Sequence, residues 1–231
     1  MIDILANIDS NITIAINSVH CDYMDQFMYL FTGRFVWIPM YAMILVLLYK
    51  KYNWQKTVVF AIGIGLTILI TDQTIATYIR PVIERLRPAN LENPISEFIH
   101  VVNDYRGGAY GFPSCHAANS FALATFMIMT ERKMRFVLFI FAWAFLNSYS
   151  RLYLGVHYFG DLIVGAILGS IIAALCFTMT EATAKVRLLH CEDRSATDKT
   201  AIARPMGCDY VIITGILTTI IISIISLCHL G

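Results

Sequence analysis

The sequence is poor in charge. Only 14% of its 231 residues are Asp, Glu, Lys or Arg, whereas 58% are hydrophobic; soluble domains carry about 25% charged residues. The chain is therefore too apolar to cover itself with a surface that faces water. Its net charge of +1 argues against a nucleic-acid partner, because such partners select strongly basic surfaces.

Paired cysteines, acidic clusters and a signal peptide are also missing. The six cysteines are scattered and form no C-x-x-C pair, which excludes a zinc ribbon and a disulfide framework. We expect most of them to be small apolar fillers. The acidic residues have no recognisable ligand spacing, so we predict no metal and no other cofactor. The first residues contain neither a basic segment nor a long apolar run and do not resemble a cleavable signal peptide.

What the sequence does contain is a series of apolar runs separated by charged residues. A helix that crosses a bilayer needs roughly 20 predominantly apolar residues. Six candidates are present, at residues 35–49, 57–79, 117–130, 136–149, 161–180 and 210–228. We therefore expect an all-α polytopic membrane protein, with residues 1–231 in one domain of six transmembrane helices.

Basic residues are concentrated after the first, third and fifth runs: Lys50, Lys51, Lys56; Arg132, Lys133, Arg135; Lys185, Arg187, Arg194, Lys199, Arg204. Cytoplasmic loops of membrane proteins carry such an excess. The sequence thus predicts that 181–209 is a polar cytoplasmic loop, and that both termini and the segments after the second and fourth runs lie outside. In the outer segment 81–112, the apolar residues Ile95, Phe98, Ile99 and Val102 have helical spacing, which predicts a helix lying in the headgroup plane.

Three polar clusters fall on the predicted outer face: RPVIERLRP (80–88), PSCH (113–116) and SRLYLGVHYFGD (150–161). Each has a purely structural explanation. Arginines at a membrane border usually extend toward headgroups, Ser114 could cap a helix, and His157 with Asp161 could be a hydrogen bond on one helix face. Their convergence on one face favours a functional site.

Phosphoryl transfer is the chemistry that uses this set of groups. Guanidinium groups bind phosphate oxygens in bidentate pairs, and the helix start at 114–117 offers free backbone N–H groups to the same anion. One imidazole could attack phosphorus while a second protonates the leaving oxygen. A carboxylate four residues from the first imidazole would fix its tautomer.

These motifs resemble the signatures of the type-2 phosphatidic acid phosphatase superfamily of membrane lipid phosphatases: K-x6-R-P, P-S-G-H and S-R-x5-H-x3-D. The chain matches the spacing of all three in order, and the resemblance covers a core of about residues 70–175. It implies His157 as the nucleophile, Asp161 as its orienting carboxylate and His116 as the proton donor. It also implies that the phosphate is bound by the residues Arg80, Arg87, Ser114, Cys115 and Arg151.

Two positions depart from the family pattern. Arg80 stands where Lys is usual, which keeps the positive charge but replaces the ammonium with a planar guanidinium that can donate two parallel hydrogen bonds. Cys115 replaces the Gly before the histidine, and a side chain there disfavours positive φ. We expect Cys115 to be tolerated because it is small.

The resemblance implies a metal-independent phosphatase of the bacterial cytoplasmic (inner) membrane, with a site that faces the periplasm and a phosphohistidine intermediate. Undecaprenyl diphosphate and a lipid A phosphate are the favoured substrates; phosphatidylglycerophosphate and phosphatidic acid are alternatives. Vanadate haloperoxidases share the motifs but are soluble proteins. A lipid-phosphate transporter or flippase would explain the arginines, but it would not need the two histidines and Asp161. The sequence does not predict the oligomeric state.

Overall fold

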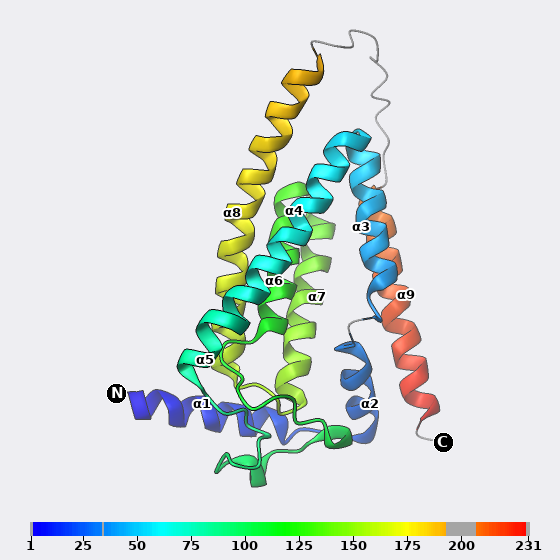
Figure 1. The fold of residues 1–231 in the computed structure, drawn as a ribbon. Helices are drawn as coiled ribbons and strands as arrows, with labels where there is room; N and C mark the ends of the chain where they lie inside the picture. The colour runs from blue at the N-terminus through cyan, green and yellow to red at the C-terminus, as the bar shows by residue number, and fades with distance from the viewer. Residues whose placement is uncertain (1, 34, 193–206, 230–231) are drawn as a thin grey trace.

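The computed structural model describes residues 2–33, 35–192 and 207–229, and most of them are helical (Figure 1). The prediction of an all-α protein is confirmed. The described residues contain no β-strand, and their only β-type pairing is an isolated bridge between Leu86 and Tyr110.

Six helices form an upright bundle: α3 (Ile38–Lys51), α4 (Trp54–Gln73), α6 (Cys115–Thr130), α7 (Met134–Tyr153), α8 (Phe159–Glu192) and α9 (Gly207–Cys228). Local signals fix where they begin. Pro39 occupies the first turn of α3, and the Asn53 side chain caps α4 by accepting a hydrogen bond from the Lys56 amide. Helix α4 continues through a π-helical turn (Thr74–Ile79) into the short α5 (Arg80–Ile83).

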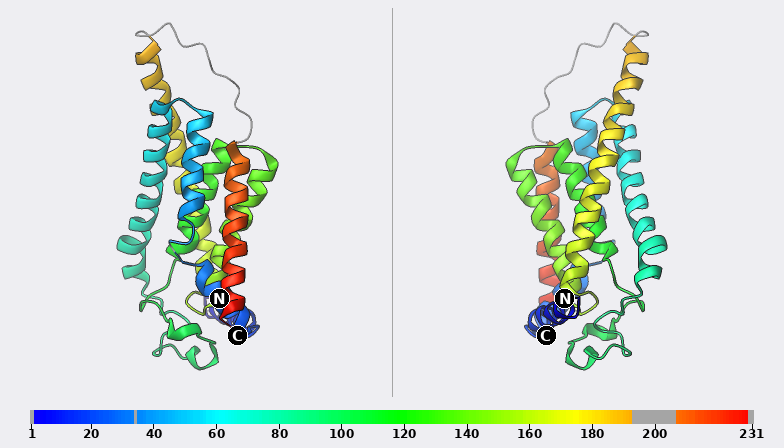
Figure 2. Two further views of the ribbon diagram at one scale, coloured as in Figure 1. Left: turned by 90° about the vertical axis from the view of Figure 1, so that its right-hand side faces the viewer. Right: turned by 90° about the vertical axis from the view of Figure 1, so that its left-hand side faces the viewer.

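Two further helices lie at the lower end of the bundle. Helix α1 (Ile2–Asn17) runs across that end, almost perpendicular to the bundle axis, and α2 (Asp22–Phe31) precedes α3 (Figures 1 and 2). The loop between α5 and α6 gathers at the same end and contains two 3-10 turns, η2 (Ser96–Phe98) and η3 (Val102–Asp104). The loop between α7 and α8 is there too, so the three polar clusters meet at one end.

By length and composition, four helical segments could cross a membrane: Trp54–Ile83, Met134–Tyr153, Phe159–Val186 and Gly207–Cys228. The six predicted spans are therefore confirmed only in part. Helices α3 and α6 have 14 and 16 residues, about 21 and 24 Å at 1.5 Å per residue, which is less than the roughly 30 Å hydrocarbon core.

Apolar side chains lie on the outside of the bundle as well as in its core. Phe60, Phe126 and Phe136 are fully buried between helices, whereas Ile171 and Leu175 on α8 are 53% and 61% exposed. An apolar exterior of this kind would be unfavourable in water and suits contact with lipid. The structure thus agrees with the membrane location that the composition indicates.

The backbones of helices α6 and α8 pack so closely that only glycine fits at two positions of α8. A Cβ atom at Gly165 would collide with the Ser114 carbonyl, and one at Gly169 with the backbone of Ala118. Small residues permit this kind of packing between membrane helices. It lets the Ser114 amide donate to the carbonyl of Asp161 at 3.1 Å, so the second and third motifs are joined through their backbones.

Two sequence predictions are corrected here. Residues 95–102 do not form an α-helix: Ile99 and Val102 are buried, while Phe98, directly before Ile99, is 60% exposed, and the backbone makes only short 3-10 turns. The apolar spacing arises because loop residues alternate between the core and the surface. The predicted polar loop 181–209 is also wrong in its first part, because α8 continues to Glu192; residues 193–206 lie outside the described part of the chain.

Helix α1 was not expected from the sequence. Its inward face is polar, because Asp9, Thr13 and Asn17 recur every four residues and contact the loops around the site. Its apolar residues Ile4 and Leu5 are 63% and 62% exposed. This is the arrangement of a helix that lies in the interface plane with its apolar side toward lipid.

Candidate active site

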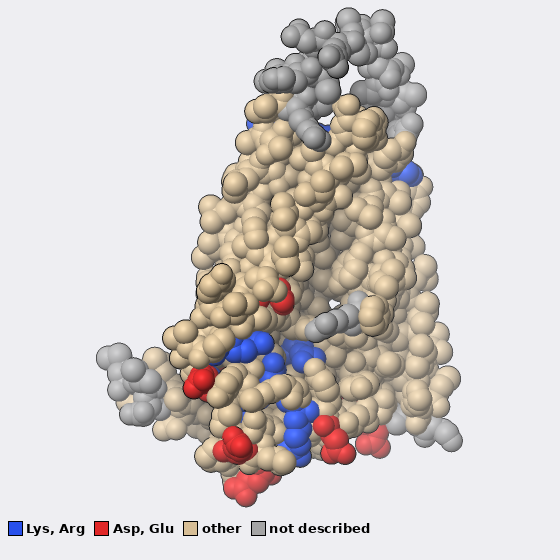
Figure 3. All heavy atoms as spheres, viewed as in Figure 1, with Lys and Arg blue, Asp and Glu red and all other residues tan. Residues whose placement is uncertain are grey.

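The three polar clusters surround one cavity of about 590 Å³ at the lower end of the bundle. Six of the predicted site residues line it: Arg80, Arg87, Cys115, His116, Arg151 and His157. Figure 3 shows basic side chains gathered on this part of the surface. Two predicted residues, Ser114 and Asp161, do not line the cavity but lie directly behind it, with 0% of either residue exposed.

His157 is held between a carboxylate and a guanidinium. Its Nδ1 lies 3.3 Å from Asp161 Oδ2, and its Nε2 lies 2.9 Å from Nη1 of Arg87. A carboxylate can only accept and a guanidinium can only donate, so Nδ1 carries the proton and Nε2 presents its lone pair. Burial, followed by the charges of Arg87 and Arg151, lowers the pKa of His157 well below 6.5, which keeps Nε2 unprotonated at neutral pH.

Three arginines place positive charge around the cavity. Arg80 donates to the Pro113 carbonyl and contacts Cys115 Sγ, both at 3.1 Å, and Arg151 donates to the Tyr105 hydroxyl at 2.9 Å. Burial together with the charges of Arg80 and Arg151 lowers the pKa of Arg87 to about 10. Like charges held this close repel one another, so the cluster favours a bound anion.

Each of these arginines, Arg80, Arg87 and Arg151, also keeps a buried Nε–H with no hydrogen-bond partner among the described residues. Buried donors of this kind are rare in folded proteins and call for a partner. A tetrahedral oxyanion in the cavity would supply acceptors to all three guanidinium groups at once. The arginine geometry therefore fits a phosphate.

The PSCH motif forms the start of α6. Ser114 is its N-cap, and its Oγ accepts from the Ala117 amide at 3.3 Å. Cys115 is the first helical residue, and its φ is not positive, so a side chain in place of the expected Gly causes no backbone strain. His116 lies at the cavity wall, with Nε2 3.2 Å from the Thr32 carbonyl.

Asp161 is supported by a residue that the motifs do not include. Arg85 Nη1 lies 2.9 Å from Asp161 Oδ1, and Arg85 Nη2 lies 2.7 Å from Oδ2 of Asp9 on α1. Asp9 in turn accepts from the Gly160 amide at 2.7 Å. Sequence reasoning treated Arg85 as a border residue, because only the fold brings Asp9 to it.

Gly111 is a second residue that sequence reasoning missed. A Cβ atom at this position would lie 3.1 Å from Arg87 Cγ and 3.4 Å from His157 Nδ1, so a side chain would press on these two residues. Its amide donates to the Arg85 carbonyl at 2.9 Å. A glycine two residues before the PSCH motif was the available signal, since close backbone approach often requires it.

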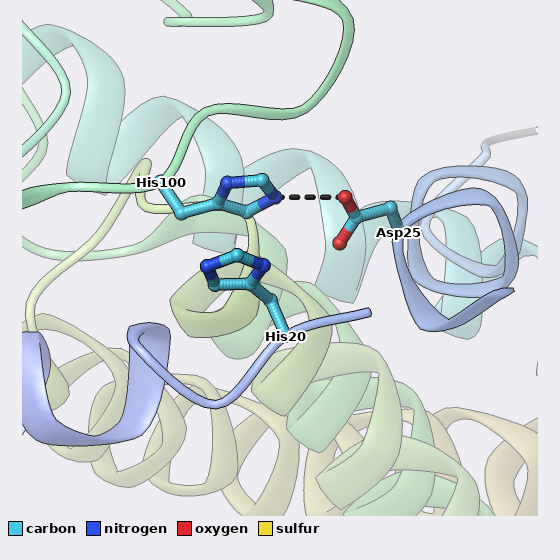
Figure 4. A group of neighbouring side chains, drawn as sticks. All are labelled: His20, Asp25 and His100. Atoms are coloured by element: carbon cyan, nitrogen blue, oxygen red, sulfur yellow. Dashed lines mark hydrogen bonds and ion pairs between the residues drawn. The ribbon is translucent and has the colours of Figure 1, made fainter. Parts of the chain in front are cut away.

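The structure also brings together three possible metal-ligating side chains, although the sequence predicted no metal site. His20, Asp25 and His100 come from three segments and place one ligand atom each within 4.8 Å of the others (Figure 4). The two imidazole planes are 2° apart and stacked at 3.7 Å, so one ion could not lie in both ring planes. His100 and Tyr153 instead hydrogen-bond to Asp25 at 2.7 and 2.6 Å, and this trio ties the outer loop to α2.

Fold and site together define a helical membrane protein with a phosphatase-type centre: two imidazoles, a buried carboxylate and three arginines around one cavity. The chain belongs to the PAP2 superfamily, whose family model matches residues 64–185. This match spans all three motifs and the helices that carry them.

Individual relatives agree with this assignment. The chain is 50% identical over 169 residues to the lipid A 4'-phosphatase of Bacteroides thetaiotaomicron, covering 73% of this chain and 75% of the relative. It is 33% identical over 170 residues to the lipid A 4'-phosphatase of Porphyromonas gingivalis, covering 73% and 71%. The crystal structure of Aquifex aeolicus LpxE has the same fold, with a TM-score of 0.55 and 24% identity over 73% of this chain and 93% of that one.

Proposed function

We propose that this protein is a lipid A phosphatase, which hydrolyses a phosphate ester of lipid A at the outer leaflet of the bacterial cytoplasmic membrane. The observation that carries the proposal is the cavity whose three arginines each keep a buried Nε–H unpaired, beside the unprotonated Nε2 of His157 that accepts from Arg87. The similarity to two lipid A 4'-phosphatases supports this substrate class. Undecaprenyl diphosphate is the second candidate, because it presents phosphate at the same leaflet.

In the proposed mechanism, the phosphoryl oxygens bind Arg80, Arg87 and Arg151, and His157 Nε2 attacks phosphorus. The phosphorus–oxygen bond to the lipid breaks while His116 gives its proton to the leaving oxygen. Asp161 stabilises the positive charge on the phosphorylated imidazole. Water, deprotonated by His116, then attacks the phosphohistidine and releases inorganic phosphate.

An assay of the purified protein against four lipids tests this function. We expect phosphate release to be fastest from lipid A, slower from undecaprenyl diphosphate, and slowest from phosphatidylglycerophosphate and phosphatidic acid. The measurement is inorganic phosphate released per minute in detergent micelles, with a boiled sample as the control. Release from none of the four would contradict the phosphatase function, whereas fastest release from phosphatidic acid would contradict only the substrate class.

We further propose that the bundle crosses the membrane six times and that the active site faces the periplasm. Two short helices, α3 and α6, would complete the four longer spans, with α2 extending α3 toward the outer face. Basic residues support this orientation: Lys50, Lys51 and Lys56 flank the turn between α3 and α4, at the end of the bundle opposite the cavity (Figure 1).

A reporter fused after Gly231 tests this orientation. Alkaline phosphatase folds only in the periplasm, so we expect the fusion to be enzymatically active in cells. A green fluorescent reporter at the same position should stay dark, and the same two reporters inserted after Lys133, in the turn between α6 and α7, should give the opposite result. A fluorescent fusion at Gly231 would place the active site on the cytoplasmic side.

A further inference from the structure

A second cavity, of about 890 Å³, opens directly from the active site into the membrane-embedded part of the bundle. It shares Thr32, Gly33, Asp72, Cys115 and His116 with the catalytic cavity. Its walls are formed by α3, α4, α6 and α7. Figure 1 shows α3 and α4 joined at the upper turn and diverging below it, and Figure 3 shows this face hollowed above the basic side chains. We call this cavity the groove.

Most of the groove is apolar, as expected of a channel for a lipid chain, but its deep wall is not. Trp143 and Asn147 lie one turn apart on α7, and Asn119 and Ser120 face them from α6. Asn147 Nδ2 donates to Ser120 Oγ at 2.7 Å. Asp72 on α4 accepts from Asn119 Nδ2 at 3.2 Å.

Three polar atoms of this wall remain without a hydrogen-bond partner among the described residues. They are the acceptors Asn119 Oδ1 and Asn147 Oδ1 and the donor Trp143 Nε1, and each is buried. Asp72 can only accept, so the Asn119 amide must point its oxygen away from it. Unpaired polar groups are costly in an apolar environment, and these three belong to residues that line one wall of the groove.

The three atoms lie at a definite depth below the phosphate site. Asn119 is four residues along α6 from Cys115, and Asn147 is four residues before Arg151 on α7, which places both about 6 Å deeper. Trp143 lies one turn further. A bound lipid would therefore meet these atoms in the part of its chain closest to the headgroup.

We propose that the groove binds a lipid chain that carries amide or hydroxyl groups next to the headgroup, and that Asn119, Trp143 and Asn147 recognise those groups. This inference rests on the proposed phosphatase function. The two unpaired acceptors require N–H or O–H donors, which an amide-linked β-hydroxyacyl chain supplies together with a carbonyl for the Trp143 N–H. A polyprenyl chain supplies none of these groups, and simple ester-linked chains supply no donor.

The experiment compares two substrates in variants of the full-length protein. The first is a phosphorylated glucosamine with one amide-linked β-hydroxyacyl chain, and the second is a polyprenyl phosphate of equal chain length. Trp143→Phe removes the indole N–H and keeps an aromatic ring at this position. We expect it to lower the ratio of kcat/KM for the first substrate over the second about tenfold, since a site built to hydrogen-bond a group loses that discrimination when one partner is removed. Asn147→Leu should act in the same direction.

Trp37 offers a matched control in the same groove. It packs edge-on against Trp143 with ring centroids 5.7 Å apart, but its Nε1 already donates to the Phe31 carbonyl at 2.8 Å. Trp37→Phe should therefore leave the substrate ratio within twofold of the wild-type value, even where it lowers stability. An unchanged ratio in both Trp143→Phe and Asn147→Leu would overturn the groove inference alone. A wild-type protein that releases phosphate from neither substrate would instead contradict the proposed function.

Discussion

Replacing His157 with alanine is expected to abolish phosphate release, with kcat lowered at least about a thousandfold, as is typical when a nucleophile is removed. Its imidazole lies in the cavity with Nε2 toward Arg87 and with the Asp161 carboxylate behind Nδ1. The measurement is phosphate released from the best substrate of the lipid panel. His20→Ala is the matched control, because His20 lies near the same face but outside the catalytic cavity.

The pH dependence of the wild-type enzyme provides a second readout for the same residue. Because the pKa of His157 is lowered well below 6.5, its imidazole remains neutral as the pH falls through the range in which an ordinary histidine becomes protonated. Protonation of the nucleophile should therefore not reduce kcat/KM above pH 6.5. Phosphate release by His157→Ala at the wild-type rate would show that another group attacks phosphorus.

Replacing Arg85 with methionine is expected to have the second largest effect, lowering kcat about a hundredfold while KM changes little. Arg85 does not line the cavity, but it pairs with the oxygen of Asp161 that His157 does not contact. Without this partner, Asp161 is held, among the described residues, only by the Tyr158 amide, which donates to Oδ2 at 3.0 Å, and it fixes the imidazole less firmly. Leaving the buried Asp161 carboxylate without this partner also lowers stability, so the rates must be measured below the Tm of the variant.

Arg106→Met provides the control for Arg85. Arg106 lies on the same outer loop and donates to the Ala89 carbonyl at 2.8 Å, but it contacts no carboxylate of the site. It should lose stability without a specific loss of kcat. If Arg85→Met and Arg106→Met reduce kcat equally, Arg85 has a general structural role in the loop; if only KM rises in Arg85→Met, it binds substrate instead.

The sequence predicts the groups of the active site better than it predicts how they are supported. Motif spacing predicted six of the residues that line the cavity, because each motif marks a point where a helix meets the lower end of the bundle. It also predicted Ser114 and Asp161, which lie behind the cavity wall. The contact between Arg85 and Asp9 joins residues 76 positions apart, and no local pattern connects them.

The pattern of apolar residues predicted helices correctly in the long apolar runs, but not in the loop that contains residues 95–102. The long apolar runs became helices, because an unpaired backbone is excluded from lipid. Residues 95–102 repeat their apolar side chains at helical spacing, yet Ile99 is buried against Gly155 in an irregular loop. In α1 the residues with helical spacing that face the protein are the polar ones, Asp9, Thr13 and Asn17. A pattern of apolar residues therefore does not predict this helix.

The contacts of α1 also determine the order in which the site can be assembled. Asp9 is synthesised 151 residues before its partner Gly160. Helix α1 must therefore wait at the membrane surface while the helices up to α7 are inserted. Asp161 lies near the start of α8, so its ion pair with Arg85 can form only after that part of the chain has been made. Hydrolytic competence is thus a late event in biogenesis. A nascent chain interrupted before α8 would carry the arginines but would lack Asp161, the carboxylate that pairs with His157.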